Sequence, residues 1–230
     1  MNDPAHASTD APLVPATRER ILDAAERQFA DLGYDGASMR QITAEAGVNL
    51  AAANYHFGDK ESLYRAVFER RIRAVNARRI ERLIEVERSG QPPTVPVLVR
   101  VVIDPMRELW LGSADGQPHP FLRCMARTLL DPQPFMRQLV QAEMAPFLQR
   151  LLPTLGRALP DLPLPELVAR LQAMMGAILF TGARLARPGG GATGELGPAA
   201  LPPESALEVL ITFCVAGLAA PATSIPRPSA

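Results

Sequence analysis

The chain has 230 residues, 47% of them hydrophobic, which is enough for one large domain or for a small domain joined to a larger one. Its 24 basic and 24 acidic residues balance. This balance excludes a general attraction to polyanions, so any binding to nucleic acid must come from a local patch.

The few cysteines and histidines limit the chemistry that the chain can carry. Cys124 and Cys214 lie far apart among apolar residues, which is typical of buried free thiols. No group of Cys and His has metal-ligand spacing, so neither a metal nor another cofactor is expected. The first residues lack the apolar core of a signal peptide, and no unbroken apolar run is long enough to span a membrane. The sequence therefore predicts a cytoplasmic protein without a membrane partner.

The N-terminal part begins with a tail and a first helix. Residues 1–16 are rich in Ala, Pro, Asp and Ser, which predicts a disordered segment. Thr17 is the expected N-cap of a helix that ends at Gly33. Apolar residues at helical spacing mark the buried face of this helix: Ile21, Ala25, Phe29 and Leu32.

Two short helices and one long helix are predicted next. Ser38 is the expected N-cap of the second helix, which breaks at Gly47. Asn49 is the expected cap of a third helix over residues 50–56. A long helix then spans residues 60–88.

The rest of the chain alternates amphipathic helices with proline breaks and shows no period-two strand pattern. A linker is expected at 89–96, a mobile Gly- and Pro-rich loop at 187–203, and a loose tail at 221–230. Pro146 and Pro153 should kink or divide the third body helix. This pattern predicts an all-α fold. The expected body helices are 97–111, 121–130, 134–159, 165–187 and 203–219.

The segment from Ser38 to Asn49 has the pattern of a helix-turn-helix. It consists of a helix, a tight turn at Ala46-Gly47-Val48 and a second, capped helix, and the turn needs a glycine because the two helices meet at a steep angle. The second helix carries small or amide-bearing residues, which suits the DNA major groove. Ordinary helical hairpins use the same residue types, so the turn alone leaves both interpretations open.

The residues that follow make the pattern more specific. Tyr55-His56-Phe57 ends the third helix, Lys60 opens the fourth, and Leu63 follows three residues later. Together with the turn, these residues resemble the DNA-binding head of the TetR family of bacterial repressors over about fifty positions. The resemblance implies a three-helix head, followed by a helical body that binds a small molecule and forms a dimer.

The resemblance also implies which residues contact DNA. Ser38 would touch a phosphate, Arg40 would reach a base edge or a phosphate, and Tyr55, His56 and Lys60 would hold phosphates. The alternative that Tyr55 and His56 are plain core residues stays open. The expected DNA contacts are Ser38, Arg40, Asn49, Leu50, Ala51, Ala52, Asn54, Tyr55, His56 and Lys60.

Part of the head departs from the family pattern. Ala51, Ala52 and Asn54 stand where many members share other residues, so a base preference is not carried over. The stretches 47–57 and 162–176 are similar to a narrower group of these repressors, which control genes of fatty-acid degradation.

The helical body offers bundle interiors in which a small apolar molecule can lodge. Arg123 and Arg127 lie one helical turn apart and are candidates for binding a carboxylate or phosphate head group, with solvated surface arginines as the alternative. Each apolar candidate is also compatible with plain core packing. The expected pocket residues are Met106, Trp110, Phe121, Arg123, Met125, Arg127, Leu129, Phe147, Met175 and Phe180.

The last two helices are apolar on two sides. Such a helix must bury both sides, so one side is expected to face its own core and the other a twofold partner. On the first of the two helices, a second stripe consists of Val168, Met175 and Leu179. The expected dimer residues are Leu167, Leu171, Met174, Ile178, Gly182, Leu185, Leu207, Leu210, Ile211, Cys214 and Leu218.

These patterns predict a head at residues 17–64 and a ligand-binding and dimerisation body at 65–220. The expected function is a repressor that binds a palindromic operator as a dimer and is released by a small apolar effector, with a fatty acid or an acyl thioester as the expected class. An enzyme and a helical protein-binding adaptor are the alternatives from other classes. No nucleophile elbow, phosphate loop or recognisable carboxylate pair supports an enzyme, and the head motif speaks against both alternatives.

Overall fold

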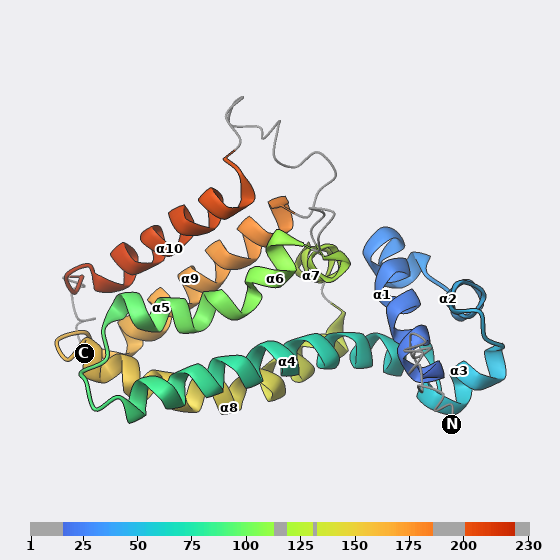
Figure 1. Ribbon diagram of the computed structural model, residues 1–230, viewed down its shortest axis with the longest axis horizontal. Coiled ribbons are helices and arrows are strands. Elements are labelled where there is room, and N and C mark those ends of the chain that lie inside the picture. Colours follow the sequence, from blue (N-terminus) through green and yellow to red (C-terminus); the bar gives the residue numbers. More distant parts are fainter. Residues whose placement is uncertain (1–15, 113–118, 131–132, 186–200, 224–230) are drawn as a thin grey trace, which may run out of the picture.

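The computed structural model describes residues 16–112, 119–130, 133–185 and 201–223. Within these ranges the chain forms helices and no strand, as the sequence predicts. Three helices make a head at one end of an elongated helical body (Figure 1). The elements are α1 (Thr17–Gly36), α2 (Met39–Ala46), α3 (Leu50–Phe57), α4 (Lys60–Arg88), α5 (Val95–Ile103), η1 (Asp104–Met106), α6 (Arg107–Leu111), α7 (Pro120–Leu130), α8 (Pro134–Ala158), α9 (Leu164–Leu185) and α10 (Pro203–Ala219).

Helix α1 differs from the prediction at its start. Its N-cap is Ala16, which has no side chain to cap with, and Thr17 is the first helical residue instead of the cap. Gly33 interrupts the helix with a φ of 75°, a conformation that glycine adopts without a steric penalty. The predicted apolar face is buried except for Leu32, which is 44% exposed. Leu32 directly precedes the break at Gly33, where the regular helical face ends.

Side chains cap each of the next three helices. Ser38 and Asn49 accept hydrogen bonds from backbone N–H groups three residues on, at 3.3 and 2.8 Å, which confirms both predicted caps. Asp59 caps α4 in the same way. Gly47 ends α2 with a φ of 63° and thereby forms the predicted tight turn. The helix-turn-helix geometry is therefore built by local sequence signals.

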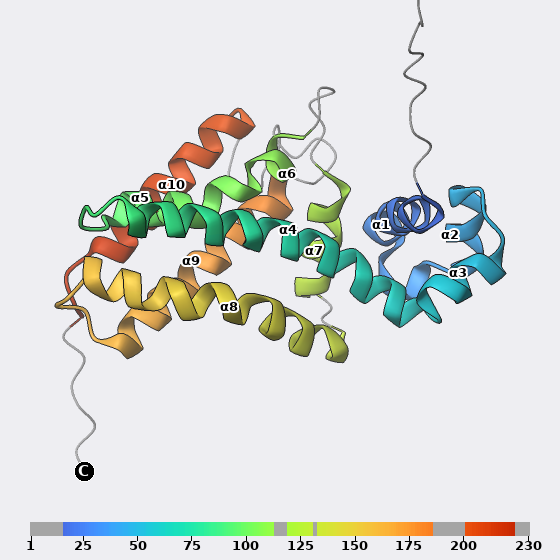
Figure 2. The same cartoon turned by 60° about the horizontal axis from the view of Figure 1, so that its bottom comes forward.

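Helix α4 connects the head to the body without a break. It is 29 residues long and crosses the expected boundary between residues 64 and 65. Helix α8 packs along it through much of the body (Figure 2). Pro146 and Pro153 were predicted to kink or divide α8, and they lie inside it without dividing it. Each proline removes a single backbone hydrogen bond, and the packing against α4 keeps the helix continuous.

The first body helices also differ from the predicted single helix over 97–111. Helix α5 already begins at Val95, because Pro96 suits the first turn of a helix. The chain then passes through the 3₁₀ turn η1 (Asp104–Met106) before α6. Pro105 lacks the N–H that a continuous α-helix would use at this point, which accounts for the change of helix type.

Helices α9 and α10 form one side of the body, where α10 packs against α5 (Figure 1). Helix α9 is long and apolar enough to cross a membrane by length and composition alone, which the sequence reading missed because charged residues interrupt the run. Core helices of soluble proteins meet the same test. The expected tail 1–16, the loop 187–203 and the tail 221–230 lie mostly outside the described residues.

One apolar core runs from the head into the body. Phe29 and Phe68 are fully buried near the head, and Trp110 and Phe147 are fully buried in the body. Phe68 of α4 meets Phe121 of α7 with ring centroids 5.1 Å apart. Head and body therefore share packing and are not joined only by a connecting segment.

Candidate nucleic-acid interface and effector site

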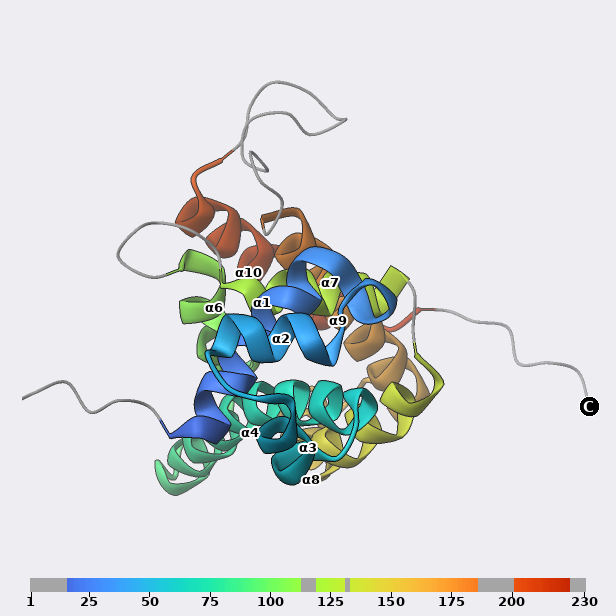
Figure 3. The ribbon, with the colours of Figure 1, turned by 90° about the vertical axis from the view of Figure 1, so that its right-hand side faces the viewer.

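Helix α3 lies at the outer end of the head (Figure 3). Ala53 is fully buried on its inner side, whereas Tyr55 on the outer side is 86% exposed. The alternative that Tyr55 and His56 are core residues is therefore wrong, because both are exposed. Ser38, Ala52 and Lys60 are half-buried. The exposed predicted contacts on α2 and α3 are Arg40, Asn49, Leu50, Ala51, Asn54, Tyr55 and His56.

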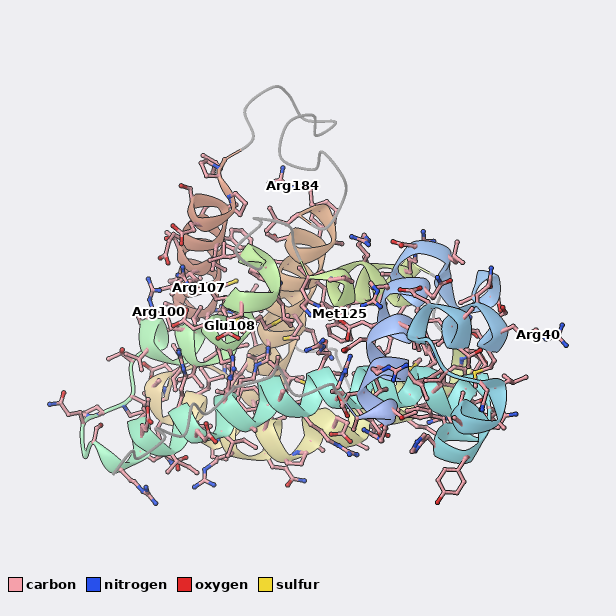
Figure 4. All side chains as sticks on the ribbon, turned by 45° about the vertical axis from the view of Figure 1, so that its right-hand side comes forward. Arg40, Arg100, Arg107, Glu108, Met125 and Arg184 are labelled. Carbon is pink, nitrogen blue, oxygen red and sulfur yellow. The ribbon has the colours of Figure 1, made fainter. Side chains whose placement is uncertain are left out.

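Arg40 is an exposed cation at this end of the molecule. Figure 4 shows its side chain extended from α2, away from the body. No hydrogen bond or ion pair joins its guanidinium to another described residue. An exposed guanidinium without a protein partner retains all five of its donors for a base edge or a phosphate.

Lys60 is less free than a surface lysine. Its Nζ atom donates to the carbonyl oxygens of Tyr34 at 3.0 Å and Ala37 at 3.2 Å. The same ammonium lies 4.4 Å from the centre of the Tyr34 ring. Lys60 thus ties the start of α4 to the segment between α1 and α2. An ammonium has three donors, so one remains for a phosphate.

The charge of the head is unfavourable for DNA except at its tip. Five basic and seven acidic residues lie between Thr17 and Lys60. Three of the basic ones are occupied: Arg18 pairs with Glu19, Arg27 pairs with Glu45, and Arg20 donates to the carbonyl oxygens of Ala46 and Gly47. The attraction to DNA must therefore come from Arg40, Lys60 and the positive N-terminal ends of the short helices.

A buried carboxylate joins the head to the body. Glu26 on α1 is 2% exposed and accepts hydrogen bonds from Arg70 and Arg71 of α4, both at 2.8 Å. The Nδ1 atom of His119, just before α7, lies 2.9 Å from its Oε1. Burial by itself would raise the pKa of Glu26, but the hydrogen bonds from His119 and Arg71 and the charge of Arg71 lower it to about 2. The carboxylate therefore stays ionised at neutral pH.

Arg123 and Arg127, predicted to bind the head group of an effector, contact the end of α1 instead. Arg123 pairs with the Asp31 carboxylate at 2.7 Å. Arg127 donates to the carbonyl oxygens of Ala30 at 3.0 Å and Asp31 at 2.8 Å. Carbonyls in the last turn before a helix break lack helical partners, so they attract a cation. In this structure the two arginines hold α7 against the head.

The apolar residues predicted to line a pocket fall into three groups. Met106, Trp110, Phe121 and Phe147 are buried in the core of the body, and Met125 and Met175 are half-buried. The ring of Phe180 is 71% exposed on the outside of α9, so it lines no interior site of the protomer. The side chain of Leu129 lies outside the described residues.

Two cavities are found at the margins of the body. One of about 490 Å³ lies where the end of α4 and the following turn meet α8, and its lining includes Glu87, Pro92 and Arg157. The other, of about 210 Å³, lies between head and body beside Tyr34 and Arg127. Of the predicted pocket residues, only Arg127 lines either of these two. Among the described residues, no group of three His, Cys, Asp or Glu is placed to hold a metal ion.

Both cysteines are buried free thiols, as predicted. Burial raises the pKa of the Cys124 thiol well above its usual range and that of Cys214 to about 11. The Cys124 thiol donates to the Glu26 carbonyl oxygen at 3.3 Å. Neither thiol is therefore activated as a nucleophile.

The residues predicted for the dimer interface face the inside of the protomer. Leu167 and Ile178 of α9, and Leu207 and Leu218 of α10, have almost no exposed surface, and the other predicted members are buried too. They fill the space between these two helices and the rest of the body. The residues predicted for the dimer interface therefore belong to the core of the protomer. The exposed face of the two helices carries Ala169, Ala173, Gly176, Phe180, Val209, Phe213 and Ala216.

The residues that join head and body were not predicted from the sequence. Arg70 and Arg71 stand in an arginine-rich stretch of α4, and nothing in that stretch distinguishes a buried guanidinium from a solvated one. His119 precedes a proline and resembles any loop residue. The one available signal was Glu26, an acidic residue next to the buried position Ala25 on the first helix.

In a comparison with known sequences, both halves of the chain match family models. Residues 21–67 match the family model described as bacterial regulatory proteins, tetR family. Residues 100–217 match the model of the tetracyclin repressor-like C-terminal domain. The second match alone covers more than half of the chain.

Curated relatives match part of the chain. The chain is 36% identical over 106 residues to the HTH-type transcriptional repressor AcnR of Corynebacterium efficiens, which is 46% of this chain and 50% of that protein. It is 32% identical over 88 residues to the HTH-type transcriptional regulator AcrR of Shigella flexneri, which is 37% of this chain and 40% of the relative. The chain thus spans about half, or less, of the length of these relatives.

Solved structures share the fold over nearly the whole chain. The transcriptional regulator FadR of Bacillus subtilis, crystallised with stearoyl-CoA, superposes with a TM-score of 0.65 at 18% identity and covers 86% of this chain and 98% of its own. SCO4454, a regulator of Streptomyces coelicolor, gives 0.56 at 22% identity over 88% and 94% of the two chains. At such identities the likeness shows the arrangement of the helices alone.

Proposed function

The chain belongs to the TetR family of bacterial transcriptional regulators, which are not enzymes, and from that premise we propose that it is a cytoplasmic repressor of the ligand-released type. It binds a palindromic operator as a dimer and leaves the DNA when a small apolar effector occupies its body. The observation that carries the DNA-binding part is the outer face of the head, where Arg40 extends from α2 and α3 offers a slim helix. The aligned repressor AcnR supports repression over activation.

A dimer is supported by the outer face of α9 and α10. Phe180, Val209 and Phe213 are all more than half exposed there, between small residues that let another helix approach closely. Exposed large apolar side chains on adjacent helices mark a protein interface. A twofold axis through this face would give a four-helix interface and two identical heads. Two heads of this kind read half-sites about 34–36 Å apart, or a multiple of that distance.

The effector is proposed to be an apolar acyl compound, either a fatty acid or an acyl thioester. The buried interior of the body includes three methionines, Met106, Met136 and Met174, and methionine side chains rearrange around flexible apolar ligands. The fold neighbour FadR was crystallised with stearoyl-CoA. This likeness is of fold, so it suggests the class of effector to test first.

Release of DNA requires that the effector favour an arrangement in which the two heads no longer fit successive grooves. Helix α4 is the main connection through which a change in the body reaches the head, since it carries Lys60 at the head and packs against α8 in the body. Helix α7 provides a second route, because Arg127 holds the end of α1. A hundredfold difference in the affinity of the effector for the two arrangements corresponds to a coupling free energy within the range of about 1–3 kcal/mol that is typical of allosteric proteins.

Operator binding is tested on DNA from upstream of the protein's own gene by anisotropy, with two variants. Arg40→Ala should weaken specific binding by about 1–3 kcal/mol while nonspecific binding changes little, because a base contact is lost. Lys60→Ala should weaken all sequences alike and flatten the salt dependence by about one unit per head, because a phosphate contact is lost. Wild-type affinity in both variants would show that the head docks differently, and the absence of any DNA binding would refute the repressor.

A further inference from the structure

Arg79 is a charged side chain inside the apolar core of the body. It lies in the middle of α4 and is 3% exposed. The sulfur atoms of Met106 and Met144 and the ring of Phe147 surround its guanidinium, with the Phe147 ring centre 5.3 Å away. These residues come from η1 and α8, so three elements meet at this one cation.

Most of the hydrogen-bonding capacity of Arg79 is not used by oxygen acceptors. Its Nε donates to the carbonyl oxygen of Val102 at 2.9 Å, and one terminal nitrogen donates to Oδ1 of Asn76 at 3.0 Å. A guanidinium has five N–H groups. Beyond these two bonds, each terminal nitrogen has one contact with a thioether, Met106 at 3.2 Å and Met144 at 3.9 Å, and thioethers are weak acceptors.

No carboxylate of the described residues pairs with Arg79. Burial accordingly lowers its pKa to about 10, with no nearby charge acting in the opposite direction. A buried cation without a counter-charge is costly for a folded protein. The Val102 carbonyl needs only one polar donor, and the second terminal nitrogen has only the thioether of Met106, a weak acceptor, as a partner among the described residues.

We infer that Arg79 is the anion-binding residue of the effector site, and that the effector is an apolar molecule with a carboxylate. This inference rests on the proposed function and narrows its effector class from acyl compounds in general to free acids. The carboxylate accepts from the two terminal nitrogens of Arg79, where the thioethers stand now, and the chain of the ligand lies against Phe147. Methionine has three rotatable side-chain bonds, so Met106 and Met144 can turn aside to make room.

Helix α4 connects this site to the head. Arg79 belongs to the same helix as Lys60 and as Arg70 and Arg71, which hold Glu26. A ligand that draws Arg79 toward its carboxylate changes the contact of α4 with Val102 in the last turn of α5. Movement of α4 along this contact displaces the start of the helix relative to α1.

The test measures ligand binding by calorimetry and by the emission of Trp110, which is the sole tryptophan, without DNA. The probes are octanoate, decanoate and palmitate, each beside the neutral alcohol of the same length and its CoA thioester. We expect at least one acid to bind wild-type protein at least tenfold more tightly than its alcohol, a difference of about 1.4 kcal/mol. We expect the thioester to bind no better than the alcohol.

Three variants test whether Arg79 causes the preference for the acid over the alcohol. Arg79→Met should lose the preference for the acid while still binding the alcohol, because the guanidinium that binds the carboxylate has been removed. Arg79→Lys should keep part of the preference, and it serves as the deciding variant if Arg79→Met does not fold. Arg78→Met is the matched control, because Arg78 is the neighbouring residue on α4 and pairs with Glu108 at the surface. It should bind the acid as wild type does.

The inference is overturned if acids and alcohols bind alike, if no acid binds folded protein, or if Arg78→Met loses as much affinity as Arg79→Met. Because the assay contains no DNA, it is independent of operator binding. A chain that binds an acid but no operator would refute the repressor and leave the site standing. A chain that binds its operator and is released by other molecules alone would refute the site and leave the repressor standing.

Discussion

Glu26 is ionised inside the molecule because groups from α4 and the start of α7 converge on it. Its two carboxylate oxygens accept from Arg70 and Arg71 and lie close to His119. Arg70 also pairs with Glu19 and Asp23 at the surface of α1, so its charge is shared among three acids. This cluster fixes the orientation of α1 against α4 with charge-assisted hydrogen bonds.

The ionisation of Glu26 predicts a loss of stability in acid. Its pKa is about 2 in the folded protein against 4.5 for an ordinary glutamate. A lowered folded pKa contributes stability above the unfolded value, and that contribution, about 3 kcal/mol here, disappears as the pH falls from about 4.5 toward 2. Urea denaturation across this range should show that Glu26→Gln is less stable than wild type at pH 7 and loses less on acidification. Parallel pH profiles for the two proteins would contradict the assignment.

At this scale the sequence predicted the caps Ser38 and Asn49, but it was wrong on Thr17 and did not predict the arginine partners. Ser38 and Asn49 act on backbone groups three residues away, so their roles are readable from local order. The partners of Arg127 lie 96 and 97 residues away, and its neighbours in the sequence do not indicate them. Arg79 was missed for the same reason, since a helix rich in arginine gives no sign of which one is buried.

The turn between α2 and α3 is fixed by the backbone conformation of Gly47 and by Arg20. Gly47 takes a φ of 63°, and Arg20 donates to the carbonyl oxygens of both Ala46 and Gly47. A Cβ atom at this position would stand 3.1 Å from a terminal nitrogen of Arg20. The turn therefore excludes larger residues by backbone conformation and by contact.

Gly47→Ala should destabilise the protein by about 1–2 kcal/mol, because alanine is strained in the left-handed conformation. Displacement of Arg20 adds to this loss. Gly156→Ala is the matched control: this glycine is exposed inside α8, and a Cβ there would have nothing within 4 Å. It should raise stability by about 0.5–1 kcal/mol, as expected for glycine replaced in a helix. Thermal denaturation of both variants measures the difference, and a stabilised Gly47→Ala protein would show that the turn is not strained.

Element boundaries were predictable where glycine or a capping residue marks them and less so where proline does. Helix α4 begins and ends at the predicted residues, Lys60 and Arg88. The prolines of α8 were expected to kink or divide the helix, which is one continuous element packed against α4. Pro96 was assigned to a linker although proline is favoured in the first turn of a helix, where α5 places it.

At the scale of the whole molecule, the amphipathic pattern predicted that α9 and α10 bury two faces but not which face turns outward. Leucines such as Leu167 and Leu210 point into the protomer. The outer face combines small residues with Phe180, Val209 and Phe213. Periodicity gives the angle between two stripes and carries no information about which of them meets the core of the same chain.

Phe213→Asp should convert the proposed dimer into a folded monomer, because an aspartate on the outer face would be buried without a partner in the interface. Leu210→Asp, on the inner face of the same helix, should instead unfold the body. Sedimentation and circular dichroism separate the two results. A dimeric Phe213→Asp protein would move the interface to another surface, and operator affinity should fall in parallel with dimer content.

The hold of α7 on α1 has a consequence for exchanging parts between regulators. A hybrid regulator is made by fusing the DNA-binding head of one protein to the ligand-binding body of another. A fusion at residue 64 of this chain would leave Arg70, Arg71, His119 and Arg127 in the body, facing a foreign first helix. The transplanted head would then lack an acid for the arginines and would present no matching break for Arg127 to cap. A working hybrid has to carry Glu26, Asp31 and Gly33 into the new head, so the exchangeable unit is a contact surface and not a stretch of sequence.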